Sequence, residues 1–225
     1  FYCDSSSFIK VEHDVAENKK TGVVWLRLNR PNKLNALTVE FGKQFEKTIQ
    51  NLNKMEDIRS VIITGEGSAF SAGGDIDFLL DRRNFSVEEN TKVMKQFYSR
   101  YLTLRDLKVP TIAAINGPAV GAGMCIAMAC DLRIASKTAK MSLNFVKLGI
   151  HPGLAATYFL PKVAGSQTAA YMLMTGAMIT GEKAKELGIV LETCEKEGVA
   201  DRALQIAREI AYSSPVAVQA VTSTL

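Results

Sequence analysis

The sequence has few of the side chains that build metal centres and disulfide frameworks. Its 225 residues include only two histidines, His13 and His151, and four cysteines. The cysteines form no CxxC pair, so neither a zinc site nor a set of disulfides is expected. No metal is therefore predicted, and a reducing compartment is favoured over an oxidising one.

Charge of one sign and long apolar runs are scarce as well. Lys and Arg number 27 against 23 for Asp and Glu, which gives +4 without a basic block. A surplus this small gives no reason to expect a nucleic-acid partner. The most apolar stretch, residues 109–130, is interrupted by two prolines and an Asn-Gly pair, so no transmembrane segment is expected. Because the sequence begins at Phe1 and not at Met, the true N-terminus is expected to be missing from it, and no targeting peptide is predicted or excluded.

Apolar residues make up 47% of the chain and charged residues 22%, as in ordinary globular domains. Hydrophobic patterning predicts an alternation of strands and helices, which is typical of an α/β domain with parallel strands. The predicted strands cover residues 23–28, 59–64, 111–115 and 131–135. Helices are predicted from the N-cap Thr38 to about residue 53, and at residues 87–107, 124–130, 167–174, 182–187 and 199–210. Further short elements are expected at residues 141–143 and 155–163.

Two loops of small residues follow two of these buried strands. They are SAFSAGGD (residues 68–75) and NGPAVGAG (residues 116–123). Ligands of α/β proteins bind at this edge of the sheet, and small residues let a ligand approach backbone N–H groups closely. One N–H from each loop would stabilise a developing oxyanion. The alternative is that the glycines only permit tight turns and close packing.

Five segments in order resemble the crotonase superfamily of enoyl-CoA hydratases and isomerases. RPNKLNAL (30–37) is similar to its RPxxxNAL segment, AFSAGGDI (69–76) to AFxAGxDI, and NGPAVGAG (116–123) with the later Cys-Asp to NGxAxGGG…CD. KLGIHPG (147–153) and AKELGIV (184–190) also resemble family segments. The resemblance implies an α/β fold built as a crotonase-like spiral of ββα units. It divides the chain into a spiral core with the acyl-CoA site at residues 1–190 and the start of a helical C-terminal region, expected to be incomplete, at residues 191–225.

The same resemblance implies an acyl-CoA thioester as the small-molecule substrate. Coenzyme A would enter as part of that substrate, with no permanently bound cofactor, and the expected assembly is a homotrimer or hexamer. The implied oxyanion donors are the backbone N–H groups of Ala72 and Ala122. The implied substrate and coenzyme A contacts are Lys33, Leu34, Ala36, Ala69, Gly74, Asp75, Ile76 and Gly121. The expected location is the mitochondrial matrix or the cytoplasm.

The sequence departs from the hydratases of this family at both catalytic glutamates. Cys125 stands at the first position and Phe145 at the second. Neither side chain can hold and activate water at neutral pH, and general acid–base help contributes about 10²–10⁴ in rate. Hydratase turnover is therefore expected to be impaired. Two hypotheses stay open: an enzyme of enolate chemistry on acyl-CoA thioesters, and a protein of the same fold that binds or assembles around CoA thioesters without catalysis.

Other ionisable groups are weaker candidates. Asp75 is interpreted as a partner of backbone N–H groups, and His151 as part of an ordinary turn. Glu88 and Glu89 lie on a helix that, by resemblance, covers the acyl pocket and could supply a carboxylate. Tyr98 and Tyr101 are interpreted as core or interface residues. A nucleotide-dependent dehydrogenase lacks its GxGxxG pattern here, and a serine hydrolase of the related Clp-protease fold lacks GxSxG and a suitable histidine.

Overall fold

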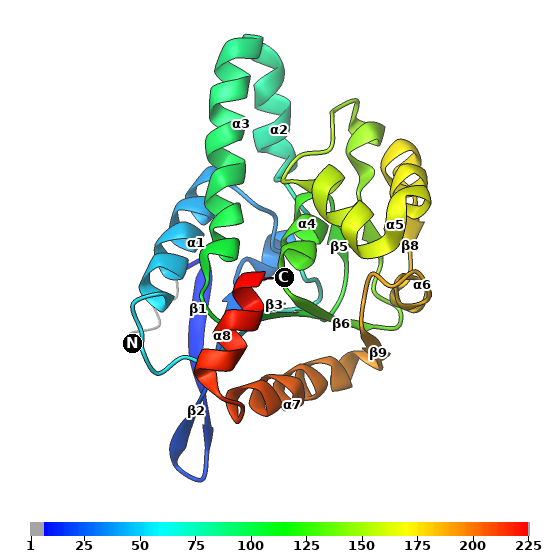
Figure 1. The fold of residues 1–225 in the computed structure, drawn as a ribbon. Helices are drawn as coiled ribbons and strands as arrows, with labels where there is room; N and C mark the ends of the chain where they lie inside the picture. The colour runs from blue at the N-terminus through cyan, green and yellow to red at the C-terminus, as the bar shows by residue number, and fades with distance from the viewer. Residues whose placement is uncertain (1–6, 225) are drawn as a thin grey trace.

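The computed structural model describes residues 7–224, in which strands and helices alternate as predicted (Figure 1). The strands are β1 (Ile9–Ala16), β2 (Lys19–Leu28), β3 (Ser60–Gly65), β4 (Thr111–Ile115), β5 (Ala119–Val120), β6 (Leu132–Ser136), β7 (Met141–Ser142), β8 (Met178–Ile179) and β9 (Glu192–Cys194). The helices are α1 (Val39–Leu52), α2 (Ile76–Asp81), α3 (Val87–Leu102), α4 (Ala122–Ala129), α5 (Ala156–Thr175), α6 (Gly181–Glu186), α7 (Val199–Ala211) and α8 (Pro215–Thr224).

The main sheet has six strands in the order β1-β2-β3-β4-β6-β9. Strand β1 pairs antiparallel with β2, and every later pair in this sheet is parallel. A smaller sheet of β5, β7 and β8 lies beside it. The strands β3 and β4 are buried along their whole length, which explains their continuous apolar sequence.

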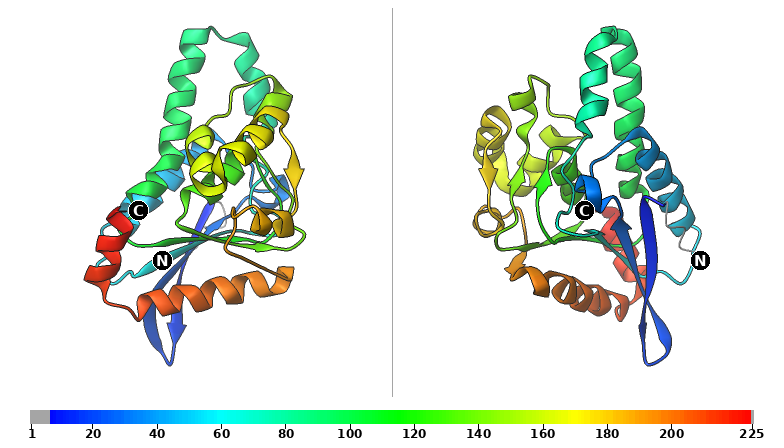
Figure 2. Two further views of the ribbon diagram at one scale, coloured as in Figure 1. Left: turned by 45° about the vertical axis from the view of Figure 1, so that its right-hand side comes forward. Right: turned by 180° about the vertical axis from the view of Figure 1, so that it is seen from behind.

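The two faces of the main sheet are covered by different helices (Figure 2). One face carries Val23, Trp25, Ile62, Ile112 and Ile134, which pack against α7. Alternate residues of the same strands point to the opposite face, where they join the larger core under α1, α3 and α4. Helices α2 and α3 project from this second layer as a hairpin, at the top of Figure 1.

Several predicted boundaries differ from the structure. The helix predicted at 87–107 ends at Leu102 and continues as a 3-10 turn, Thr103–Asp106. The helix predicted from residue 124 begins two residues earlier, at Ala122. The separate elements at 155–163 and 167–174 form one helical run, α5, that is broken at Gly165, whose φ of 77° is not helical.

Candidate active site

The two small-residue loops meet at one edge of the main sheet because β3 and β4 are parallel neighbours. Two isolated β-bridges hold the first loop between the segment that contains Leu37 and the second loop. Leu37 pairs with Gly74 on one side, and Ser71 pairs with Ala119 on the other. The segments 34–37, 71–75 and 119–122 therefore lie side by side, although they are far apart in the sequence.

Gly73 is one of the residues at which the two loops approach each other closely. It has a φ of +90°, and a Cβ atom there would lie 2.5 Å from the Val120 carbonyl oxygen and 3.3 Å from the Ala122 nitrogen. A side chain at this position would separate the loops. The glycine is required here both for its backbone conformation and for close approach.

Most amides of the first loop already have acceptors. The Ala72 N–H donates to the Leu34 carbonyl (2.9 Å), and the Asp75 N–H donates to the Leu37 carbonyl (2.9 Å). The Gly73 N–H donates to Ser71 Oγ (3.2 Å). Among the described residues, none accepts from the N–H of Gly74. The same holds for Ala122, which is the first residue of α4 and so has no acceptor within the helix.

These two unpartnered amides belong to residues that line one cavity of about 130 Å³. Of the residues predicted from the sequence, it brings together Ala72, Gly74, Ile76, Gly121, Ala122 and Phe145. The predicted residues that do not line it are Lys33, Leu34, Ala36, Ala69, Asp75 and Cys125. Its remaining walls come mainly from apolar side chains of α2, α3 and the segment 145–150. The cavity is therefore an apolar site with a few convergent polar groups, as small-molecule sites usually are.

Asp75 has the structural role that the sequence indicated. Its Oδ1 accepts from the Asp77 N–H (3.1 Å) and so caps α2, and its Oδ2 accepts from Arg30 Nη1 (2.6 Å). The hydrogen bond from Arg30 holds the pKa of this carboxyl below its usual value, against the opposing effect of burial. The Asp75 side chain is 10% exposed, so the pair fixes the end of the loop from within the protein.

Cys125 and Phe145, the two positions that the resemblance assigns to catalytic glutamates, lie differently. Phe145 is buried and forms part of the cavity wall. Cys125 is fully buried behind the wall, and its Sγ donates to the Gly153 carbonyl at 3.6 Å. Burial raises the pKa of the Cys125 thiol far above its usual value, so it is not a thiolate at neutral pH.

A second cavity of about 360 Å³ adjoins the first. The two share Ile76, Leu79, Met94, Tyr98, Leu148 and Ile150. The second cavity also reaches Arg82, Arg83 and His151, so its far end is cationic while its shared wall is apolar. The helices α2 and α3, which form the projecting hairpin of Figure 1, supply most of this space.

Asn35 and Asn144 were not predicted as site residues, and Tyr98 was interpreted as a core or interface residue but lines the cavity. Asn35 is fully buried, and it accepts from the Arg30 N–H (2.7 Å) and donates to the Ala69 carbonyl (2.9 Å). Its place in the RPNKLNAL segment was the only signal. Tyr98 and Asn144 carry the polar side chains of the smaller cavity. Tyr101, by contrast, is core as interpreted, and its hydroxyl donates to the Thr38 carbonyl (2.7 Å).

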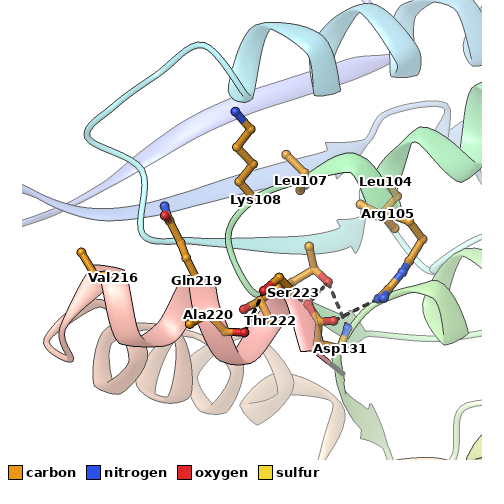
Figure 3. Close-up of a pocket in the computed structure, with 11 residues that line it drawn as sticks. Leu104, Arg105, Leu107, Lys108, Asp131, Val216, Gln219, Ala220, Thr222 and Ser223 are labelled. Carbon is orange, nitrogen blue, oxygen red and sulfur yellow. Dashed lines mark hydrogen bonds and ion pairs between the residues drawn. The ribbon is translucent and has the colours of Figure 1, made fainter.

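A larger cavity, of about 580 Å³, lies away from these loops, between α8 and the segment 104–111 (Figure 3). Its acid, Asp131, is already paired with Arg105 (3.0 Å) and accepts from the Thr111 N–H (2.8 Å). Because these polar groups satisfy one another, we place the candidate active site at the smaller cavity with unpartnered amides.

Comparison with solved structures defines the class of fold. The chain superposes on an enoyl-CoA hydratase from Bacillus anthracis with a TM-score of 0.87 and 31% identity, over 96% of this chain and 81% of that one. This is the crotonase fold. The family model for enoyl-CoA hydratase/isomerase matches residues 18–225, so the chain belongs to that family.

Curated relatives carry several different activities in their names. The chain is 33% identical over 198 residues to 1,2-epoxyphenylacetyl-CoA isomerase of Escherichia coli K12, covering 88% of this chain and 76% of the relative. It is 34% identical over 216 residues to mouse mitochondrial methylglutaconyl-CoA hydratase, covering 94% and 67%. Within residues 7–224, no cluster of His, Cys, Asp and Glu could hold a metal ion, and no helix is long and apolar enough to cross a bilayer.

Proposed function

We propose that this chain binds an acyl-CoA thioester with the thioester oxygen between the N–H groups of Gly74 and Ala122. The observation that carries the proposal is that Gly74 and Ala122, from separate loops, both line one apolar cavity and that neither amide has an acceptor among the described residues. Ala72, the donor expected from the sequence, is replaced by Gly74 because the Ala72 N–H already donates to Leu34. Ala122 also lies at the start of α4, where the helix dipole favours negative charge.

The proposed chemistry is an enolate-type step on the acyl group. Two amides that stabilise the developing oxyanion lower the barrier to forming a thioester enolate. Hydration in particular is expected to be slow, because Cys125 and Phe145 replace the groups that would take a proton from water. Lys33, Leu34 and Ala36 stay proposed contacts of the coenzyme A moiety, as the resemblance implies.

We also propose that the acyl chain extends from the smaller cavity into the larger one. The smaller cavity, of about 130 Å³, is below the usual range of ligand sites, whereas its apolar neighbour of about 360 Å³ lies within it. We therefore expect the protein to bind acyl groups longer than four carbons. A homotrimer or hexamer is the proposed assembly, and light scattering on the purified protein measures it.

A second function is favoured by one specific observation. Both usual carboxylates are absent, which is what a non-catalytic CoA-thioester-binding protein would show. Crotonyl-CoA turnover, followed by loss of the absorbance of the conjugated thioester, separates the two functions when butyryl-CoA binding is measured in parallel. Binding with turnover supports the enzyme, and binding without turnover supports the binding protein. Failure to bind butyryl-CoA contradicts both.

A further inference from the structure

The cavity at the two amides contains very little chemistry apart from them. Of its lining residues, only Tyr98 and Asn144 have side chains with hydrogen-bonding groups. The carboxamide of Asn144 does not exchange protons at neutral pH. Tyr98 is therefore the one ionisable side chain among the described residues that line this cavity.

Tyr98 is held in place on two sides. Its ring packs edge-on against Phe97, with ring centroids 5.7 Å apart. Its hydroxyl lies against the Cα of Gly153, in the space that a side chain at position 153 would occupy. Because Gly153 has no side chain, the hydroxyl of Tyr98 takes that space.

The same hydroxyl is next to Cys125, which stands at the position of a family glutamate. The Cys125 thiol donates to the Gly153 carbonyl, so the thiol and the Tyr98 hydroxyl both lie against Gly153. No described residue forms a hydrogen bond with the hydroxyl. Tyr98 itself lines both cavities, so its side chain borders the space proposed for the acyl group.

Burial keeps this group protonated. Desolvation, with a smaller effect from Cys125, raises the pKa of Tyr98 to about 12. A phenol with that pKa is neutral at pH 7, so it cannot take a proton there, and it is a weak acid that protonates only a strongly basic atom such as an enolate carbon. This fits a proton donor and excludes the role of the glutamate that takes a proton from water.

We propose that the Tyr98 hydroxyl is the catalytic acid that protonates the α-carbon of the thioester enolate. The inference deepens the proposed function and rests on it. When water adds to the β-carbon of an enoyl thioester, the electron pair of the double bond moves to the carbonyl oxygen, held by the two amides. The Tyr98 O–H bond then breaks, a C–H bond forms at the α-carbon, and the carbonyl is restored. The added water gives its surplus proton to solvent, and solvent reprotonates the phenolate through the second cavity.

Other groups are less suited to this role. Glu89 caps α3 through Ser86, and neither Glu88 nor Glu89 lines the cavity. His151 is exposed and lines only the far cavity. The Cys125 thiol is fully buried and already bonded. Each lies outside the smaller cavity, whereas Tyr98 is one of its lining residues.

Tyr98→Phe removes only the hydroxyl and tests the role directly. With crotonyl-CoA, we expect kcat to fall by about 10²–10⁴, the range for loss of a general acid. The KM, and the Kd for unreactive butyryl-CoA, should stay unchanged. Tyr212→Phe, which changes a tyrosine that is 83% exposed, serves as the matched control.

Gly153→Ala supplies a second variant with the hydroxyl chemically intact. The added methyl overlaps the hydroxyl of Tyr98, which must move, so we expect a comparable loss of kcat. If the Tyr98→Phe variant binds butyryl-CoA and turns over crotonyl-CoA as the wild type does, the inference is overturned. Wild-type binding without any turnover overturns it too, while leaving thioester binding intact. Wild-type protein that does not bind butyryl-CoA overturns the proposed function itself.

Discussion

Ala122→Pro removes one proposed oxyanion donor while keeping the fold. Ala122 is the first residue of α4, where proline is favoured, and its N–H has no acceptor among the described residues. Loss of one oxyanion donor costs about 2.7–4 kcal/mol in transition-state stabilisation, or about 10²–10³ in kcat. The stability change should be small, since proline at a compatible position contributes about 0.4–1 kcal/mol. The melting temperature should therefore move by about 2–4 °C at most.

The assay is steady-state turnover of crotonyl-CoA, with butyryl-CoA binding and thermal melting measured on the same preparations. Ala122→Gly is the matched control because it keeps the N–H and removes only a methyl group. We expect this variant to be at least as active as the wild type, since the methyl borders the cavity. An Ala122→Pro variant that melts normally and retains wild-type kcat would refute the donor role of this amide.

Three further predictions concern Asp75, the cysteines and the acyl chain. Asp75→Asn should lower the free energy of unfolding at pH 7 by about 1.5–3 kcal/mol, as expected for a hydrogen bond to a charged group. Because the pKa of Asp75 is lowered in the folded protein, this stabilisation is present above the usual pKa of 3.8 and is lost as the pH falls through the lowered pKa. If denaturant unfolding gave the same free-energy difference between the wild type and Asp75→Asn at pH 7 and at pH 2.5, the reasoning would be contradicted. Thiol labelling of the native protein, mapped by mass spectrometry, should modify Cys194 and spare Cys125 and Cys130, which are fully buried; labelling of the buried pair before unfolding would disagree with the packing. Saturated acyl-CoA thioesters should bind more tightly by about 0.8 kcal/mol per added CH₂ until the second cavity is filled, and calorimetry showing no gain beyond four carbons would exclude that cavity.

The parts of the fold predicted from the sequence are those whose residues are buried in a regular pattern. The strand 111–115 has the bounds expected, and α1 begins after its N-cap Thr38, whose side chain accepts from the Phe41 N–H. Strand β1 was not predicted, because it is an edge strand with many half-exposed polar residues. Helix α2 was not predicted either, since its six residues are too few to show a repeating apolar pattern and none of them is buried.

The candidate site was predictable at the level of loops and not of single groups. The sequence indicates that two small-residue loops meet, and they do. It does not reveal which amide of the first loop lacks an acceptor, because the acceptors Leu34 and Leu37 come from a distant segment. Tyr98 was interpreted as a core or interface residue, and its place at the cavity was not predicted, for a related reason. Its neighbours Phe97 and Tyr101 form the buried stripe of α3, whereas Tyr98 lies outside that stripe and lines the cavity.

The central claim is that two backbone amides polarise one thioester carbonyl. The ¹³C NMR spectrum of butyryl-CoA labelled at the carbonyl carbon measures this polarisation without requiring turnover. We expect the carbonyl resonance of the bound thioester to move downfield in the wild type, and to move clearly less in Ala122→Pro at saturating ligand. A bound thioester whose carbonyl resonance stays at its position in free solution would contradict the account.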